Sequence, residues 1–147
     1  MLTSNDMQKV LDIQDKNLLF EEDCVSYALF KNHYCKFIYC TLSYMPTACK
    51  HCGEPNQNYS IYKNGSQTSS VTFPTTGVTP TYLNVKKQRF KCKNCQRTFT
   101  ASTPIVQENC FISNFIKAAV LVNASEARSV KNIALETHVS ATTVQRL

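Results

Sequence analysis

The amino-acid sequence predicts an α+β fold made of consecutive parts, on three observations. Residues 1–48 combine one short helical pattern with strand-like runs, and residues 49–100 are β-rich and bracketed by two Cys-x-x-Cys motifs. After residues 101–110 the spacing of apolar residues becomes helical. We therefore expect a small N-terminal helix with an antiparallel sheet, β-hairpins joined by the cysteine motifs, a linker, and a C-terminal helix-turn-helix over residues 111–147.

The N-terminal part begins with a short helix. Ser4 or Asn5 is the candidate N-cap, because short polar side chains accept hydrogen bonds from the first helical N–H groups. Three apolar residues follow at helical spacing: Met7, Val10 and Leu11. Runs rich in β-branched and aromatic residues then predict strands at residues 18–21, 25–30 and 34–44, with a turn at Lys31 and Asn32.

The two Cys-x-x-Cys motifs, at residues 49–52 and 92–95, are the most informative feature of the sequence. Each motif can turn two sulfurs toward one point, and together they supply the four thiolates that a tetrahedral structural Zn²⁺ requires. The paired spacing in strand-like surroundings predicts a zinc ribbon. The expected ligands of one structural Zn²⁺ are Cys49, Cys52, Cys92 and Cys95.

Two other uses of these cysteines fit less well. A thioredoxin-like redox pair needs a single motif at the start of a helix, and two disulfides need an oxidising compartment, to which nothing in the sequence points. The cysteines outside the motifs lack metal-ligand spacing, so we expect them in the core: Cys24, Cys35, Cys40 and Cys110. His33 and His51 are expected to be structural or exposed, because four thiolates already complete the site.

Between the motifs, residues 59–63 predict a strand that ends in a turn at Asn64-Gly65, and residues 67–70 predict a polar tip. Residues 81–92 predict the longest strand, which leads directly into the second motif. Its apolar residues change parity near residues 86–88, which predicts a β-bulge there.

Positive charge is concentrated in the ribbon. The chain has a net charge of +6, whereas residues 49–107 alone have eight basic side chains and one acidic one. Four thiolates with one Zn²⁺ leave this segment at about +5, which predicts a polyanionic partner. Six basic residues on and after the longest predicted strand are the candidate phosphate contacts: Lys86, Lys87, Arg89, Lys91, Lys93 and Arg97. A solvated strand face is the alternative interpretation.

The N-terminus lacks the positive n-region and the apolar h-region of a signal peptide. No apolar run reaches the length of a transmembrane helix. We therefore expect a cytosolic protein with reduced thiols.

The C-terminal part predicts helices. Ser113 is the candidate cap of a helix whose apolar face includes Phe115, Ile116 and Val120. Residues 129–147 then predict a helix-turn-helix with these core residues: Ile133, Ala134, Val139, Val144 and Leu147.

Ser140 is the expected cap of the second helix of this motif. Four polar residues of that helix are expected to project outward, where a recognition helix meets bases and phosphates: Thr142, Thr143, Gln145 and Arg146. His138 stands where a turn glycine is usual, and Thr137 replaces a larger apolar residue. An ordinary helical hairpin is therefore the alternative.

Together these features resemble the N-terminal region of bacterial insertion-sequence transposases of the ISL-three family. The resemblance is carried by the following residues: Cys49-Lys-His-Cys-Gly53, Thr75-Thr-Gly-Val-Thr-Pro80, Arg89-Phe-Lys-Cys-Lys-Asn-Cys-Gln-Arg-Thr-Phe99, and Ile133-Ala, Val139-Ser and Val144. In that family an RNase H-like catalytic domain follows, whose Asp and Glu residues hold Mg²⁺. The resemblance implies a module that binds double-stranded DNA at the terminal inverted repeats of a mobile element, in the bacterial cytoplasm at the nucleoid.

The resemblance also implies that this chain is the front of a longer protein, ended inside the second helix by truncation or frameshift. Glu108, Glu126 and Glu136 fit helix ends or exposed helix faces better than a Mg²⁺ site, so we do not expect this chain itself to be an enzyme. A zinc hydrolase is disfavoured, because four thiolates leave no open position for water.

Other binding roles stay open. A stand-alone zinc-ribbon transcription regulator and a protein-interaction zinc module are the alternatives to a transposase module. Full-length transposase and a second copy of the chain are further expected partners, and neither a membrane nor a small-molecule substrate is expected.

Overall fold

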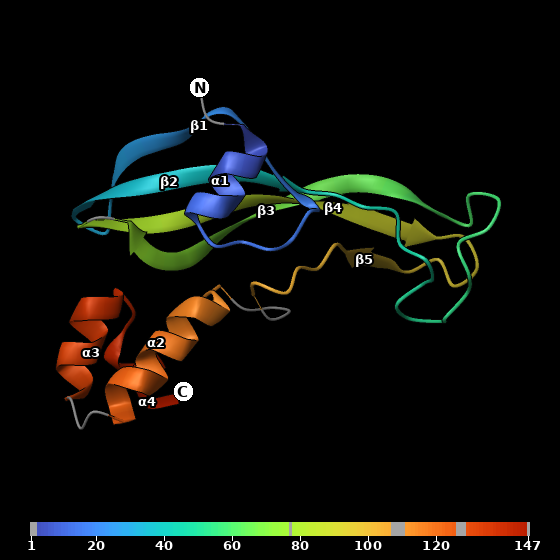
Figure 1. The fold of residues 1–147 in the computed structure, drawn as a ribbon. Helices are drawn as coiled ribbons and strands as arrows, with labels where there is room; N and C mark the ends of the chain where they lie inside the picture. Colours follow the sequence, from blue (N-terminus) through green and yellow to red (C-terminus); the bar gives the residue numbers. More distant parts are fainter. Residues whose placement is uncertain (1–2, 77, 107–110, 126–128, 147) are drawn as a thin grey trace.

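The computed structural model describes residues 3–76, 78–106, 111–125 and 129–146. Within these ranges the chain forms four short helices and one mixed sheet of five strands, an α+β architecture (Figure 1). The helices are α1 (Ser4–Val10), α2 (Asn114–Ser125), α3 (Val130–Thr137) and α4 (Ala141–Arg146). The strands are β1 (Leu18–Phe30), β2 (His33–Leu42), β3 (Ile61–Thr76), β4 (Thr79–Cys92) and β5 (Thr98–Thr100). The strand order is β1-β2-β4-β3, and β5 pairs with β4.

Helix α1 is capped by Thr3 rather than by either predicted residue. The Thr3 hydroxyl oxygen accepts the N–H of Asp6 at 3.2 Å, and the Asp6 carboxylate accepts the N–H of Thr3 at 2.9 Å. This reciprocal capping box stabilises the carboxylate, so the pKa of Asp6 is lowered. Ser4, one of the predicted caps, instead accepts the N–H of Phe20 at 3.0 Å and fastens α1 to β1.

Strands β1 and β2 form the antiparallel hairpin that the sequence predicted. Lys31 and Asn32 make its turn with φ values of 51° and 65°, a combination typical of type I′ turns. The two strands predicted at residues 18–21 and 25–30 are one strand, β1, with a register shift between Phe20 and Val25.

The prediction of a separate N-terminal antiparallel sheet is wrong. Strand β2 also pairs in parallel with β4, from Lys36 opposite Thr81 to Leu42 opposite Lys87. The mixed sheet therefore joins residues from both sides of the predicted boundary between residues 48 and 49. A two-stranded hairpin buries too little apolar surface to be stable alone, which is a physical reason for the two hairpins to share one sheet.

Strand β3 runs straight through the predicted turn at Asn64-Gly65. Lys63 pairs with Phe90 and Ser66 pairs with Gln88, so Asn64 and Gly65 together lie opposite Arg89 and form a β-bulge. Gly65 has a φ of 78°. Residues 67–70 are paired strand rather than a polar tip. The sequence predicted a β-bulge near residues 86–88 of β4. A bulge lies next to this position, but its extra residue is on β3 and not on β4.

The main core lies on one face of the sheet, against which α1 and residues 101–106 pack (Figure 1). Its fully buried members include Leu18, Leu42, Ile61, Leu83, Val85 and Phe90. The passage predicted as a linker contributes Ala101, Ile105 and Val106 to this core, and Thr103 donates a hydrogen bond to the Asp15 carboxylate at 2.6 Å. Residues 107–110, Cys110 among them, lie outside the described ranges.

Helices α2, α3 and α4 form a second, smaller core. Its buried members come from all three helices: Ile116, Val120, Ile133 and Val144. The N–H of Thr72 on β3 donates to the carbonyl of Phe111 at 2.8 Å, and the N–H of Ser113 donates to the carbonyl of Thr72 at 2.9 Å. Ser113 also caps α2 as predicted, since its hydroxyl oxygen accepts the N–H of Ile116 at 3.3 Å. None of the helices in the described ranges is long and apolar enough to cross a membrane.

The positive φ of Gly65 in the bulge leads to a prediction about its substitution. No atom lies within 4 Å of the position that a Cβ would take, so Gly65→Ala adds only backbone strain at a positive φ. We expect it to lower the free energy of unfolding by about 1 kcal/mol, and Gly65→Asn to lower it by less, as measured by urea denaturation. Ser66→Ala is the control at the neighbouring exposed position. A Gly65→Ala variant as stable as the parent would contradict this account of the bulge.

Candidate metal centre

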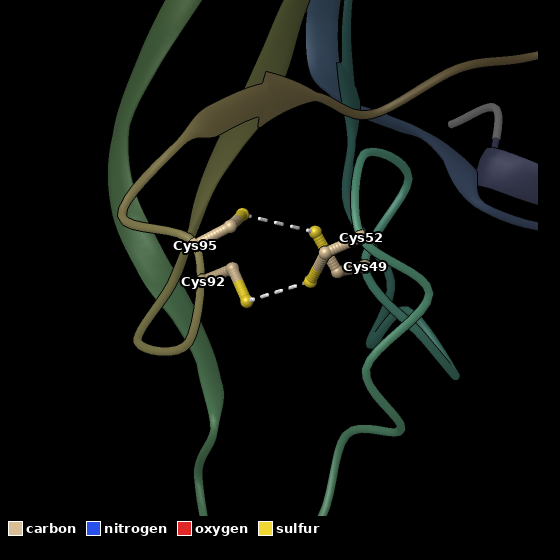
Figure 2. Close-up of side chains that lie close together, drawn as sticks. All are labelled: Cys49, Cys52, Cys92 and Cys95. Atoms are coloured by element: carbon tan, nitrogen blue, oxygen red, sulfur yellow. Dashed lines mark hydrogen bonds between the residues drawn. The ribbon is translucent and has the colours of Figure 1, made fainter.

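The four motif cysteines meet at one end of the sheet. Cys49 and Cys52 lie in the loop between β2 and β3, while Cys92 ends β4 and Cys95 lies in the turn to β5 (Figure 2). All four sulfur atoms lie within 4.8 Å of one another. The Sγ atoms of Cys49 and Cys95 are 3.7 Å apart, as are those of Cys52 and Cys92.

These distances fit a tetrahedral zinc site. Four sulfurs at about 2.3 Å from a central Zn²⁺ are about 3.8 Å from each other, whereas a disulfide would bring two sulfurs to about 2.05 Å. The seven cysteines in the described ranges are free thiols. The four motif cysteines therefore form a zinc-ribbon site, consistent with one structural Zn²⁺, as the sequence predicted.

Both motifs fold into the same tight turn, which we call a knuckle. In the first knuckle the N–H of Gly53 donates to the carbonyl of Cys49 at 3.0 Å, and in the second the N–H of Gln96 donates to the carbonyl of Cys92 at 2.9 Å. The residue after the second cysteine has a positive φ in each, 76° at Gly53 and 60° at Gln96. This left-handed residue reverses the chain and lets both sulfurs of a motif face the same point.

Backbone dipoles favour the thiolate form of Cys49. Burial acts to raise the pKa of Cys49, but hydrogen bonds from the backbone N–H groups of Cys52 and His51 outweigh burial and bring this pKa to about 6. The N–H of His51 lies 3.4 Å from the Cys49 sulfur. A thiolate is the form that binds a metal, so the first knuckle is prepared for its ligand role.

The pKa values of Cys52 and Cys95 are shifted in opposite directions. The pKa of Cys52 is lowered by the backbone N–H of Glu54 and by the side-chain amide of Asn94, whose nitrogen lies 3.6 Å from the sulfur. The backbone N–H of Arg97 acts to lower the pKa of Cys95, but burial and hydrogen bonds with the other thiols raise it to about 11. Binding of Zn²⁺ displaces all of these protons, so zinc affinity falls as the pH falls.

His51 has a structural position, in keeping with its prediction. Its Nε2 lies 3.1 Å from the carbonyl oxygen of Thr98, and its ring meets the edge of Phe99 at 6.2 Å. Phe99 in turn packs against Phe90 of the main core at 5.4 Å. These contacts hold the first knuckle against β5 in addition to the four sulfurs.

The six basic residues predicted to contact phosphate do not share one surface. Lys86 lies opposite Thr68 and lines a groove with the carboxylates of residues 21–23. Lys87 lies opposite Gln67 and faces the other side of the sheet, because successive side chains of a strand alternate. Lys86 and Lys87 therefore lie on opposite faces of the sheet.

The other four basic residues lie on the hairpin near the zinc centre: Arg89, Lys91, Lys93 and Arg97. The Arg89 guanidinium donates from Nη2 to the Thr98 hydroxyl at 3.3 Å, while its buried Nε has no hydrogen-bond partner in the described structure. The Lys93 ammonium lies 5.9 Å from the centre of the Tyr62 ring. Arg97 is exposed in the second knuckle.

The residues predicted to read bases lie on α4. Helix α3 ends at Thr137 and is capped by His138, whose φ of 60° is the left-handed conformation usual for glycine. The Ser140 hydroxyl oxygen accepts the N–H of Thr143 at 3.1 Å and caps α4 as predicted. Thr142, Gln145 and Arg146 are exposed, whereas Thr143 is half-buried with its hydroxyl 2.8 Å from that of Ser140. Leu147 lies outside the described ranges.

Sequence reasoning missed three residues that the fold brings beside Lys87. Lys50 lies inside the first motif, and Gln67 and Ser69 lie in the stretch predicted as a polar tip, yet all three line one groove with Lys87. The one signal was the lack of Asp and Glu from residue 55 to residue 107. That signal locates no single residue, because the zinc centre and the strand register bring these side chains together.

Comparison with known protein families gives a match to this part of the chain. A family model described as the zinc-finger of transposase IS204/IS1001/IS1096/IS1165 matches residues 45–95, which include both knuckles and all four cysteines. Neither curated proteins nor solved structures give a match. The match supports a zinc ribbon of the transposase type; β5 and the three C-terminal helices lie beyond it.

The metal centre predicts one zinc per chain. Cys92→Ser removes a thiolate, and we expect the variant to lose both the zinc and the folded state of this end of the sheet. Zinc binding to such sites contributes roughly 10 kcal/mol or more to folding. Metal analysis and circular dichroism check both losses. Cys24→Ser is the control, because this buried cysteine lies outside the cluster and its loss should leave the zinc content unchanged. A metal-free parent protein of undiminished stability would rule out the assignment.

Proposed function

We propose that this chain binds double-stranded DNA as the DNA-binding region of an insertion-sequence transposase, and that it recognises the terminal inverted repeats of its element. The observation that carries the proposal is the match of residues 45–95 to a transposase zinc-finger model, at the segment where four sulfurs converge on one point. Such a protein would work at the bacterial nucleoid.

The proposed role is binding rather than catalysis. Among the described residues, the four cysteines are the one group of Cys, His, Asp or Glu side chains that can hold a metal. A zinc ion with four thiolate ligands has no open position for a water or a substrate, so it stabilises structure and does no hydrolysis. The zinc would hold the two knuckles together as a rigid platform for the basic residues around them.

The proposal divides the contacts between two parts of the chain. The lysine and arginine side chains near the zinc centre would neutralise phosphates, a contribution that is independent of sequence. We assign this role to Lys87, Lys91, Lys93 and Arg97, and not to Lys86, which lies beside three carboxylates. Helix α4 would read base edges with its exposed polar side chains: Thr142, Gln145 and Arg146.

A protein-interaction zinc module is the second candidate, and one observation favours it. The β1–β2 hairpin exposes Tyr27, Leu29 and Tyr34, and the two tyrosine rings stack with their centres 6.4 Å apart. Exposed aromatic residues are enriched at protein interfaces. Binding to a protein with no affinity for duplex DNA at low salt would favour this role over the first.

The DNA proposal predicts a strong dependence of affinity on salt. If four basic side chains contact phosphates, the plot of log affinity against log salt concentration should have a slope of about −3.6. Lys93→Ala and Arg97→Ala, at two exposed positions, should each make the slope shallower by about 0.9. Fluorescence anisotropy with a labelled duplex between 50 and 200 mM salt measures this. An affinity that does not change with salt, or no binding at the lowest salt, speaks against the proposal.

The role of α4 is tested separately through sequence discrimination. Gln145→Ala removes an uncharged side chain, so the salt slope should stay unchanged. Discrimination between a duplex containing the ends of the element and a scrambled duplex should fall by about 1–3 kcal/mol if Gln145 contacts a base. A variant that discriminates as well as the parent would show that Gln145 reads no base.

A further inference from the structure

Strand β1 lies at one margin of the sheet and pairs with β2 along one of its two edges. Helix α1 covers the first part of the other edge, because the Ser4 hydroxyl oxygen accepts the N–H of Phe20 at 3.0 Å. The Gln8 side chain also donates to the carbonyl of Leu18 there, at 2.7 Å. Further along, at residues 25–30, no described strand or isolated bridge pairs with this edge. We call residues 25–30 the open edge.

We propose that the open edge binds the open edge of a second copy of the chain, as a pair of antiparallel strands related by a two-fold axis at Tyr27. The sheets of the two copies would thereby join into one continuous sheet. This homodimer goes beyond the proposed DNA-binding function, and its formation does not require DNA.

The backbone of the open edge is directed toward such a partner. Residue pairs in antiparallel strands alternate between pairs that exchange hydrogen bonds and pairs whose N–H and carbonyl groups point away from the partner strand. The partners of Phe20 and Val25 are two residues apart on β2, so these two pairs are of the same kind. The N–H of Phe20 points away from β2, toward Ser4. By the same alternation, the backbone groups of Val25, Tyr27 and Leu29 also point away from β2 and can pair with another strand.

The side chains of the open edge lack the features that normally protect an edge strand. Edge strands are usually kept from pairing by charged residues, by proline or by a covering element. The open edge, Val-Ser-Tyr-Ala-Leu-Phe, contains no charged residue and no proline. Val25, Tyr27 and Leu29 share one face and are 39%, 54% and 71% exposed. Pairing about Tyr27 would set the two Tyr27 side chains opposite each other and Val25 opposite Leu29, which removes apolar surface from water.

Charge complementarity favours a second copy in this orientation. Residues 21–23 are three exposed acidic residues in the register shift before the open edge, and exposed Lys31 lies in the turn after it. Antiparallel pairing centred on Tyr27 would bring the acidic segment of each copy beside the Lys31 turn of the other. A parallel pairing would instead place the two acidic segments side by side, which costs free energy.

The position of the open edge leaves the other sites free. Figure 1 shows β1 at the margin of the sheet away from α2, α3 and α4. Cys92 of the zinc centre ends β4, whereas the open edge leads to the turn beside the start of β4. The two copies would thus pair without covering the zinc centre or α4. Six residues of one strand from each copy form a small interface, so we expect the dimer to dissociate on dilution.

Exchange of two charges tests the pairing and its orientation together. Asp23→Lys and Lys31→Asp each bring like charges together at both ends of the paired strands, so each should raise the dissociation constant of the dimer about tenfold. The double variant with both changes should restore the parent value. Asp23 and Lys31 lie at opposite ends of the open edge in one chain, so this restoration requires a second copy. Sedimentation velocity from 5 to 500 µM protein measures the dissociation constant, and Lys63→Asp, the same charge change at an exposed position of β3, is the control.

A disulfide provides a second test, at the two-fold axis itself. Directly opposite residues in antiparallel strands have Cα atoms about 5.5 Å apart, which is within the range of a disulfide. Tyr27→Cys should therefore form a covalent dimer when oxidised glutathione takes up the hydrogens of the two thiols. Tyr34→Cys is the matched control, because Tyr34 is also exposed but lies one strand further from the axis. It should give no more covalent dimer than the parent chain. Zinc content and thermal unfolding of each variant show that the fold is retained.

The outcomes distinguish the dimer from its interface. A parent chain that sediments as a monomer at every concentration up to 500 µM would overturn the dimer. A dimer that is weakened equally by the single and double charge variants, or that forms a disulfide as readily through Tyr34→Cys as through Tyr27→Cys, would overturn the open edge as its interface. All of these measurements are made without DNA, so a failure of the DNA-binding proposal leaves them unchanged.

Discussion

The convergence of four sulfur atoms on one point is the constraint on which the rest of the structure depends. Two knuckles 40 residues apart must bring Cys52 and Cys92 to 3.7 Å. The end of β4 and the loop after β2 are therefore held side by side, and β5 returns from the second knuckle along β4. Through His51 and Phe99 the same constraint extends into the main core, and it places Lys50 above the face of the sheet that carries Lys87.

The mixed sheet determines how charge is distributed over the surface. The parallel pairing of β2 with β4 places β4 in the middle of the sheet, so each of its side chains lies on one of two distinct faces. Lys86 falls on the face with the carboxylates of residues 21–23, and Lys87 falls on the opposite face, in a groove beside the first knuckle. A run of basic residues that looks continuous in sequence thus becomes two surfaces of different electrostatic character.

Errors of prediction arose where one local signal has more than one structural use. Asn64-Gly65 is a strong turn signal because glycine accepts a positive φ, but a β-bulge needs the same conformation, and long-range pairing with β4 selected the bulge. Ser4 and Thr3 are both able to cap a helix. The Asp6 carboxylate selected Thr3 by closing a capping box, which left Ser4 to bind β1.

The sequence by itself determined the features that depend on contacts within a few residues: the cysteine pairs, the turn at Lys31 and Asn32, and the caps at Ser113 and Ser140. Their geometry is set by neighbours along the chain, so spacing and residue type suffice to predict them. Tertiary structure alone decided that β2 pairs with β4, that Lys86 and Lys87 serve different faces, and that Lys50, Ser69 and Lys87 line one groove. A shift of register by a single residue exchanges the two faces of a strand, and register follows from the packing of the whole core rather than from any local pattern.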